Sequence, residues 1–457
     1  MVTVTVNRKA ADRAASGHPW IFASDIIDRG DAAPGDAVLV AAVNRNGTPG
    51  KPLGIAHYSS TSQIALRMLS ESVERQFLKP LPLVTARELS DNEPLPLVAA
   101  RKMVAAREPI DRAFFIRRLN AAIGHRECVV QNSNAYRLVY SEGDLLPGLI
   151  VDRYGPYLVM QTLTQGMDRA RDVIAECLTE LLAPAGIFAR NDASVRKLEG
   201  LPLESMVLSG EIPERVHVGM NGLSLEADLR RGQKTGVYLD QRENYVAVAQ
   251  CAAQFAARYV ARTNHPGGDT SGRILDCFTS TGGFALHCGR AMETSGQTSG
   301  AETGLIEAID SSAPALATAE ANARANGIAN IHFRQADVFE FLSGVASNNP
   351  RRYSMIILDP PAFAKSRRSL DDAARGYKEI NFRALKLLEP GGVLVTCSCS
   401  HHMSEAALLE IVAAAALDAG KTLRVLDRRT QAADHPILLT VPETHYLKCL
   451  ILEVLAT

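Results

Sequence analysis

An aspartate and a cysteine, each just beyond a predicted strand, have the side chains that covalent chemistry on a planar ring requires. Asp359 follows the apolar run 355–358, and Cys399 follows the apolar run 393–396. If the two strands are parallel neighbours in one sheet, their carboxyl ends bring Asp359 and Cys399 together. The thiolate of Cys399 is then a candidate nucleophile. Pro360 and Pro361 stiffen the loop from which Asp359 can reach the polar edge of a base.

A second cysteine in the same segment, Cys397, is the alternative nucleophile. Cys397 lies inside the predicted strand, where a free cysteine commonly packs as a small apolar side chain, so we expect Cys399 to act. Both cysteines could also form a metal cluster with His401 and His402. That spacing fits no usual zinc pattern, and we expect no metal.

Acidic residues at the ends of three earlier strands predict a site for an adenosine cofactor. Asp276 lies in the segment ILDCFTSTGGF at 274–284, Asp310 follows the apolar run 305–309, and Asp337 follows a third strand. A carboxylate after the second strand can accept hydrogen bonds from both ribose hydroxyls. The carboxylate after the third strand can receive the exocyclic amine of adenine. The alternatives are a plain tight turn at 274–284 and an Asp310 that only caps a helix.

The turn after Asp276 favours a cofactor without phosphates. It contains no lysine or arginine, and the chain has no phosphate-binding Gly-x-x-x-x-Gly-Lys motif. We therefore expect S-adenosylmethionine. The residues expected to contact it in and beside these turns are Asp276, Thr281, Gly282, Gly283, Phe284, Asp310, Ser311, Asp337 and Val338.

The cysteine indicates which atom such a cofactor would methylate. Carbon 5 of a pyrimidine is not nucleophilic enough to attack a methyl sulfonium directly. Addition of a thiolate at carbon 6 makes carbon 5 enamine-like, and the thiol leaves after methyl transfer and loss of the carbon 5 proton. Methylation of a ring nitrogen or an exocyclic amine needs no such cysteine. We expect Pro360, Phe363 and Lys365 to contact the nucleotide, Phe363 by stacking and Lys365 at a phosphate.

The elements that position these residues read as an α/β fold, because strands and helices alternate after about residue 221. Strand-like runs at 274–278, 305–309, 331–335, 355–358 and 393–396 alternate with helix-like runs at 283–290, 313–326, 337–342 and 377–388. Two further runs, 437–440 and 446–454, predict an antiparallel pair at the end of the sheet. The expected architecture is a Rossmann-like, seven-stranded, mostly parallel sheet with an antiparallel last strand.

A chain of 457 residues is too long for one ordinary core, and we expect three domains. Short strands and turns in residues 1–76 predict a small β-barrel. Residues 77–212 mix strand-like and helix-like runs and predict an α+β domain. Residues 213–457 hold the catalytic sheet, with Ser/Thr/Gly-rich stretches at 263–272 and 294–304 as surface insertions.

Composition and patterning argue against a strongly basic nucleic-acid-binding protein, a disulfide-rich secreted protein and a membrane protein. With 46% apolar and 22% charged residues, the chain resembles soluble globular proteins. Its formal net charge of -1 means that any RNA must be bound by local patches or by shape. The eight cysteines show no disulfide framework, and neither a signal peptide nor a membrane span is apparent. We expect a cytoplasmic protein without a membrane partner.

Specific motifs are spread along nearly the whole chain. They are GHPWIF at 17–22, PGD at 34–36, SEGDLLPGLIVDRY at 141–154, RNDASVRK at 190–197, GQKTGVYLDQREN at 232–244, DPPAFAKS at 359–366 and SCS at 398–400. Together they resemble the family of bacterial large-subunit ribosomal RNA 5-methylcytosine methyltransferases with an N-terminal PUA domain.

The resemblance implies roles for particular residues. It implies that Cys399 is the nucleophile, that Asp359 holds the cytosine, and that the PUA-like and central domains grip structured ribosomal RNA. It also implies that three residues of the 232–244 motif, Lys234, Thr235 and Asp240, close over the cofactor. Cys397 and Cys449 depart from the family pattern, which more often has a bulky apolar residue and a glycine at these positions.

Other functions stay open from the residues alone. Guanine-methylating ribosomal enzymes share the Asp-Pro-Pro-x-Phe pattern but lack Cys399, whereas a uracil-methylating enzyme would share this cysteine. A catalytically inactive ribosome-assembly factor would be expected to lose the acids or the nucleophile. An NAD-dependent dehydrogenase would need a fuller Gly-x-Gly-x-x-Gly turn. The sequence leaves open the modified nucleotide, the base that removes the carbon 5 proton, the choice between free RNA and an assembled particle, and whether the chain forms a homodimer.

Overall fold

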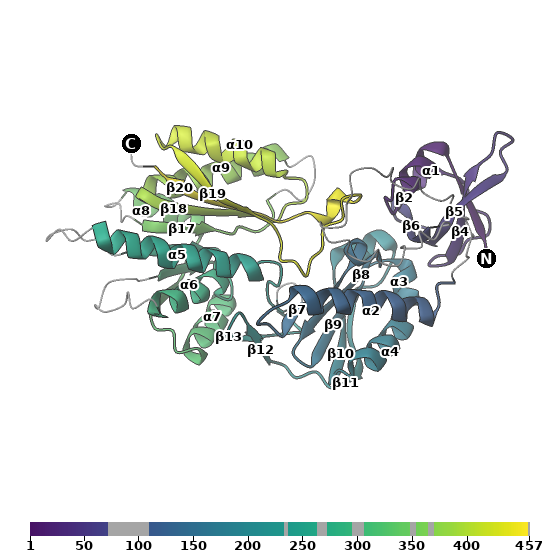
Figure 1. Cartoon of the computed structure of the whole chain (residues 1–457), viewed down its shortest axis with the longest axis horizontal. Coiled ribbons are helices and arrows are strands. Elements are labelled where there is room, and N and C mark those ends of the chain that lie inside the picture. The colour runs from purple at the N-terminus through teal and green to yellow at the C-terminus, as the bar shows by residue number, and fades with distance from the viewer. Residues whose placement is uncertain are drawn as a thin grey trace, which may run out of the picture.

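The computed structural model describes residues 1–71, 109–232, 236–262, 272–294, 306–347, 353–363 and 370–455. In this part of the chain, three units follow one another, each built on its own main sheet (Figure 1). The two predicted insertions and the connector at 77–110 fall almost entirely outside the described residues. Lys234, Thr235 and Lys365 lie outside them as well.

The N-terminal unit confirms the predicted β-rich domain. Within residues 1–71, six strands form one sheet in the order β2-β6-β5-β4-β1-β3. Its elements are β1 (Thr3–Val6), α1 (Arg8–Ala15), β2 (Trp20–Phe22), β3 (Ile26–Asp28), β4 (Ala37–Val43), β5 (Pro49–Tyr58) and β6 (Ile64–Glu71). Alternate residues of its strands, such as Val4, Val6, Val38 and Val40, are fully buried and form a small core of their own.

The central unit has the α+β character expected from its mixed sequence pattern. Between residues 109 and 215, five strands form a sheet in the order β11-β10-β9-β8-β7, with α2 and α4 packed together. Its elements are α2 (Arg112–Val129), β7 (Ala135–Tyr140), β8 (Leu149–Tyr154), β9 (Tyr157–Thr162), α3 (Gln165–Arg169), α4 (Arg171–Leu182), β10 (Gly186–Asn191) and β11 (Glu204–Gly210). The edge strand β11 was not predicted. A two-stranded hairpin, β12 (Val216–Met220) with β13 (Leu223–Ala227), then leads into the catalytic unit.

The C-terminal unit is the predicted mostly parallel sheet. In the described part of residues 236–455, seven strands run in the order β16-β15-β14-β17-β18-β20-β19, and only β20 opposes its neighbours. The strands are β14 (Ile274–Cys277), β15 (Ile306–Asp310), β16 (Ile331–Gln335), β17 (Tyr353–Leu358), β18 (Leu388–Ser398), β19 (Leu423–Arg429) and β20 (Lys448–Val454). The strands that follow β14 in the chain lie on both sides of it, β15 on one side and β17 on the other. Open α/β sheets bind their ligands where the strand order reverses in this way.

Two layers of helices cover this sheet. The helices α5 (Arg242–Arg262), α6 (Gly283–Thr294) and α7 (Ala313–Ala325) lie on one face, and α8 (Val338–Ser347), α9 (Leu370–Leu387) and α10 (Glu405–Asp418) lie on the other (Figure 1). Neighbouring strand residues therefore enter different cores. Ile357 packs with α5 and α6, whereas Ile356 and Leu358 pack with α9. Burial on both faces explains why the strands read as unbroken apolar runs.

One predicted strand is wrong. Residues 437–440 form a turn, and the partner of β20 is β19. The apolar residues that suggested a strand point outward, since Leu439 is 100% exposed and Ile437 is 41% exposed. The residues of β19 escaped prediction because its polar and charged side chains alternate with only a few apolar ones.

Candidate active site

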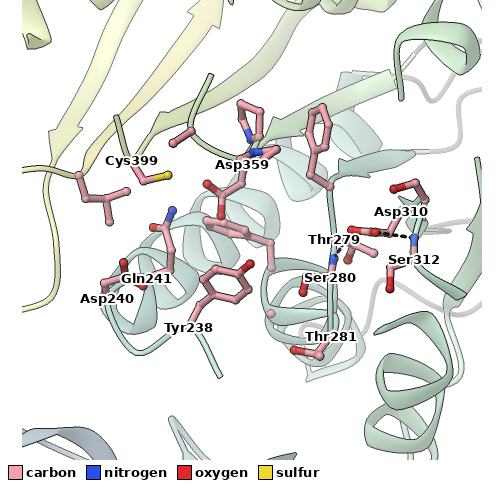
Figure 2. Close-up of a pocket in the computed structure, with 18 of the residues that line it drawn as sticks. Tyr238, Asp240, Gln241, Thr279, Ser280, Thr281, Asp310, Ser312, Asp359 and Cys399 are labelled. Carbon is pink, nitrogen blue, oxygen red and sulfur yellow. Dashed lines mark hydrogen bonds between the residues drawn. The ribbon is translucent and has the colours of Figure 1, made fainter. Parts of the chain in front are cut away.

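The carboxyl ends of β14, β15, β17 and β18 open into a cavity of about 550 Å³ (Figure 2). Each of the four strands ends in, or is followed by, residues that line this cavity. Of the residues predicted from sequence, those in its wall are Asp240, Thr281, Gly283, Phe284, Asp310, Ser311, Asp337, Asp359, Pro360, Phe363 and Cys399. Among the described residues, the structure thus gathers most of the predicted cofactor residues and the predicted chemical residues around one space.

Among the described residues, Asp276, Gly282 and Val338 were predicted to contact the cofactor but do not line the cavity. The Asp276 carboxylate is fully buried behind the turn that follows β14. It accepts hydrogen bonds from the Thr279 hydroxyl at 2.6 Å and from the Ala285 N–H at 3.0 Å. Burial raises its pKa to about 7. Asp276 therefore fastens the turn to the start of α6.

That turn has an unusual backbone. Phe278 and Ser280 have φ angles of 63° and 51°, and Gly282 has a φ of 88°. Non-glycine residues adopt positive φ at a cost, which folded proteins tolerate mostly at functional sites. The result is a close backbone approach to the cavity at the start of α6, where free N–H groups and the helix dipole are available.

Asp310 is held by the same turn. One carboxylate oxygen accepts the Ser280 N–H at 2.9 Å, and the other accepts the Ser312 N–H at 2.8 Å (Figure 2). Each oxygen keeps a second lone pair, so the carboxylate can still accept two hydroxyl groups from the cavity side. This arrangement fits the vicinal hydroxyls of a ribose. Asp337 caps α8 through the Glu340 N–H at 3.0 Å.

Gly283 allows a second close approach. A Cβ atom at Gly283 would lie 2.4 Å from Cζ of Tyr245. Tyr245 packs edge-on against Phe284, with ring centroids 4.7 Å apart, and both rings contribute to the wall. The turn, the paired oxygens of Asp310 and these apolar rings together fit the adenosine part of S-adenosylmethionine, because they offer acceptors for hydroxyls and a flat surface for a base.

The opposite end of the cavity holds the chemical residues. Figure 2 shows Asp359 and Cys399 pointing into the same space, with Tyr238 and Gln241 below them. Burial raises the pKa of the Tyr238 hydroxyl, and the nearby Asp359, Asp240 and Cys399 raise it further. The ring of Phe363, predicted to stack on a base, packs 4.8 Å from the ring of Tyr377.

Gln241 carries a buried hydrogen-bond donor directed at this end. Its side chain is 2% exposed, and its Oε1 atom accepts a hydrogen bond from Asn244 at 2.7 Å. Its Nε2 atom is buried and makes no hydrogen bond of good geometry with any described residue, although the side chain lies close enough to the Cys397 thiol to lower its pKa. In Figure 2 the amide nitrogen points toward Cys399 and Asp359. A buried donor without an acceptor is costly, which marks it as a position for a ligand oxygen.

The two candidate cysteines have different surroundings. Cys397 is fully buried, and its neighbour Cys449 together with burial raises its pKa well above the ordinary value. Cys399 is half-buried and lines the cavity. Because a thiol must ionise and reach its substrate to act as a nucleophile, the surroundings favour Cys399.

A buried lysine lies beside Cys399. Lys448 is 3% exposed, and its Nζ donates hydrogen bonds of 2.9 Å to the carbonyl oxygens of Ser400 and Tyr446. Burial lowers its pKa to about 8, although Cys399 and Glu405 act in the opposite direction. At pH 7 the group therefore keeps its charge, and a nearby cation favours the thiolate form of Cys399.

Sequence reasoning missed Tyr238, Gln241 and Lys448. The first two belong to the segment GVYLDQREN, whose position in a specific motif was a usable signal. Lys448 had no such signal in the sequence, because an isolated lysine in a strand is normally interpreted as a solvent-exposed residue.

Contacts between the units involve residues of the GHPWIF motif at 17–22. Trp20 Nε1 donates a hydrogen bond of 2.8 Å to Glu142 of the central unit, and His18 Nε2 lies 3.3 Å from Glu443 of the catalytic unit. Arg13, by contrast, forms an ion pair of 3.1 Å with Asp25 within the N-terminal unit itself. Trp20 and His18 therefore tie the N-terminal unit to the other two.

The described residues contain neither a candidate metal centre nor a helix suited to span a membrane. No three side chains of His, Cys, Asp or Glu in these ranges lie close enough to hold a metal ion. Among the helices of the same ranges, none combines the length and apolar character of a membrane span.

Comparison with known protein families agrees with the fold and with the expected cofactor. Residues 4–71 match the family model of a PUA-like domain, and residues 202–442 match that of an S-adenosylmethionine-dependent methyltransferase. Together with the seven-stranded sheet and its cavity, the match over more than half of the chain defines a class I methyltransferase that uses S-adenosylmethionine. The expected cofactor is confirmed.

Curated relatives narrow the class to one family. Proteins named ribosomal RNA large subunit methyltransferase I match this chain at 35% identity in Tolumonas auensis, over 95% of each chain, and at 37% in Aliivibrio fischeri, over 94% of each chain. This chain belongs to the ribosomal RNA large subunit methyltransferase I family, which confirms the resemblance seen in the motifs.

Solved structures share the whole fold. A Streptococcus mutans protein classed as an S-adenosylmethionine-dependent methyltransferase matches with a TM-score of 0.71 at 18% identity, over 99% of this chain and 100% of its own. A methyltransferase solved in complex with S-adenosylhomocysteine matches with a TM-score of 0.72 at 18% identity over the same shares. At this identity the likeness supports the fold alone.

Proposed function

We propose that this chain transfers a methyl group from S-adenosylmethionine to carbon 5 of a cytosine in large-subunit ribosomal RNA, through a covalent bond to Cys399. The choice of RNA rests on the names of relatives that share 35% to 37% identity with it. The observation that carries the carbon chemistry is the half-buried Cys399 in the wall of the cavity that also holds Asp310 and Asp359.

Cys399 starts the reaction as a thiolate. When bound, S-adenosylmethionine supplies an electrophilic methyl group. Cys399 Sγ forms a bond to carbon 6 of the base, and the electron pair of the double bond between carbons 5 and 6 forms a bond from carbon 5 to the methyl group. The bond between the methyl group and the sulfonium sulfur breaks, and its electron pair stays with the sulfur of S-adenosylhomocysteine, which is the leaving group. A base then removes the carbon 5 proton, the double bond re-forms, and the electron pair of the bond between sulfur and carbon leaves with Cys399.

Asp359 and Gln241 form a complementary edge for cytosine. The carboxylate of Asp359 accepts a hydrogen bond from the amino group on carbon 4, a group that uracil lacks. The amide nitrogen of Gln241, which is buried without an acceptor among the described residues, donates to the carbonyl on carbon 2. Uracil would instead present an oxygen to Asp359, and two acceptors facing each other disfavour binding.

The N-terminal and central units bind the RNA around the target. A net charge of -1 excludes binding through overall charge, so exposed residues such as Arg8, whose side chain is 93% exposed, supply local contacts to phosphates. The match of residues 4–71 to a PUA-like domain supports this division of labour.

The test is methyl transfer from labelled S-adenosylmethionine to protein-free large-subunit RNA and to assembled large subunits, followed by nucleoside analysis. We expect labelled 5-methylcytidine with the wild type, none with Cys399→Ala, and near-normal amounts with the matched control Cys397→Ala. Equal cofactor binding by the three proteins would show that only chemistry was lost.

Each other outcome contradicts a part of the proposal. Label on uracil would overturn the role of Asp359 and Gln241, and label on guanine would overturn the covalent mechanism. Full activity in Cys399→Ala would do the same. Absence of label on both substrates, with cofactor bound, would overturn ribosomal RNA as the substrate.

A further inference from the structure

A second, smaller cavity lies next to the first. It measures about 220 Å³, and the residues of its wall that matter here are Arg137, Tyr140, Asp240, His401, His435 and Tyr446. Asp240 lines both cavities, so it stands between them. The wall joins the central unit, through β7, to the catalytic unit, through the segments after β18 and before β20. No part of the proposed chemistry uses this space.

Flat rings dominate the wall. The ring of His401 stacks on that of Tyr446, with centroids 5.3 Å apart and planes at 28°. Tyr140 lies 5.3 Å from His435, and the Arg137 guanidinium lies 5.6 Å from the centre of the Tyr140 ring. Proteins hold unstacked RNA bases on such aromatic and guanidinium surfaces.

The position of His401 connects this cavity to the reaction. His401 is exposed and follows Cys399 by two residues, whereas the Tyr446 beneath it is fixed, because its hydroxyl donates a hydrogen bond of 2.7 Å to Asp240. A base bound at Cys399 therefore lies near the exposed ring of His401, which is only two residues further along the chain. The volume is below the ~300–1,000 Å³ of pockets for drug-sized ligands, and it suits a single base.

We propose that this cavity receives the base of a nucleotide adjacent to the methylated one, stacked on the ring of His401. The inference rests on the proposed function, because it assumes that RNA is the substrate. A target base that enters the active site must leave its stack, and its neighbours lose a stacking partner. The His401 ring replaces that partner and holds the RNA strand at the junction of the central and catalytic units.

The charges around the cavity agree with stacking on a neutral ring. Partial burial of its ring against Tyr446 lowers the pKa of His401, and the nearby Lys448 and His402 lower it further, so the imidazole is uncharged at pH 7. Arg137 is held by two hydrogen bonds to Asp152, of 2.8 Å and 2.9 Å, and supplies a fixed cation at the back of the wall. The wall therefore combines aromatic rings with the guanidinium of Arg137, whose charge is paired with that of Asp152, and with the carboxylate of Asp240.

Replacement of His401 tests the proposal. We expect His401→Ala to raise KM for RNA about tenfold, the range of a lost base–aromatic stack, with a much smaller change in kcat. His401→Phe should restore KM, since it keeps a flat ring. His402→Ala removes the adjacent exposed histidine and should behave as the wild type. Cofactor affinity should be equal in all four proteins.

An abasic substrate makes the test specific. In a short RNA containing the methylated site, loss of the base on one side of the target should raise the wild-type KM. The same loss should add little to the KM of His401→Ala, because the partner is already missing. Additive effects, or an unchanged KM in His401→Ala, would overturn this inference while wild-type turnover upheld the proposed function. A wild type that methylates no RNA would overturn both.

Discussion

The ammonium group of Lys448 donates a hydrogen bond of 2.9 Å to the carbonyl oxygen of Ser400, the residue that follows Cys399. The contact joins the first residue of β20 to the loop after β18, and it places a buried cation beside the proposed nucleophile. Activation of a cysteine by a cation is an electrostatic effect on the pKa of its thiol, so it can be measured as a change in pH dependence.

We expect Lys448→Met to move the rising limb of the pH profile of kcat/KM to higher pH by about 1 unit, the lower end of the effect of an adjacent opposite charge. The sign follows because a thiol without a neighbouring cation ionises at higher pH. The matched control is Lys378→Met, since Lys378 is a lysine at the surface paired with Asp418. An unmoved limb in Lys448→Met would show that the lysine only supports the loop.

Gln241→Leu should lower kcat/KM for RNA about tenfold, because one buried hydrogen bond contributes roughly 0.5–1.5 kcal/mol. The free energy of unfolding should change little, since the variant loses the bond to Asn244 but also removes a buried donor that lacks an acceptor. Gln254→Leu, at an exposed position of α5, is the control. Steady-state kinetics with unaltered RNA give the answer, and an equal kcat/KM in both variants would refute the role of Gln241.

RNA that contains 5-fluorocytidine at the target should trap the enzyme. After methyl transfer, carbon 5 would carry fluorine and methyl but no proton, so the bond to Cys399 could not be released. We expect a covalent complex that resists denaturing electrophoresis, requires S-adenosylmethionine, and forms with Cys397→Ala but not with Cys399→Ala. A complex that forms with Cys399→Ala would move the nucleophile elsewhere.

Asp276→Asn should remove one component of the dependence of stability on pH. The folded-state pKa of Asp276 is about 7, above the ordinary value of 3.8, so the unfolded chain releases this proton first as the pH rises. The contribution of Asp276 is present in full below about pH 4 and is lost between about pH 4 and pH 7. Denaturant titrations should find the wild type losing more stability over this interval than the variant. Parallel curves would place the folded pKa near its ordinary value.

Gly283→Ala should destabilise the catalytic unit and weaken cofactor binding. The added Cβ would lie 2.4 Å from the buried ring of Tyr245, and such overpacking costs about 1–3 kcal/mol. The control is Gly124→Ala in α2, where no described atom lies within 4 Å of the added Cβ. There the gain in helix propensity should stabilise by roughly 0.5–1 kcal/mol. Thermal unfolding with and without S-adenosylmethionine measures both effects.

Much of the catalytic fold could be predicted from the sequence. Strands buried on both faces appear as apolar runs, and β14, β15, β16, β17 and β18 were found in this way, as were the helices α6, α7, α8 and α9. The prediction failed where local pattern and packing disagree. Residues 437–440 look like a strand but form an exposed turn, and β19 looks polar but completes the sheet.

The amino-acid sequence by itself determined which chemistry the chain can perform, because residue types carry it: carboxylates at strand ends, one cysteine beyond a strand, and a stiff Pro-Pro loop. The tertiary structure decided which of these groups face the cavity. It turned Asp276 inward to hold a loop and brought Lys448 to the loop after Cys399, a contact between residues 48 positions apart. Side-chain direction and distant contacts depend on how strands pair and pack, and no local pattern records them.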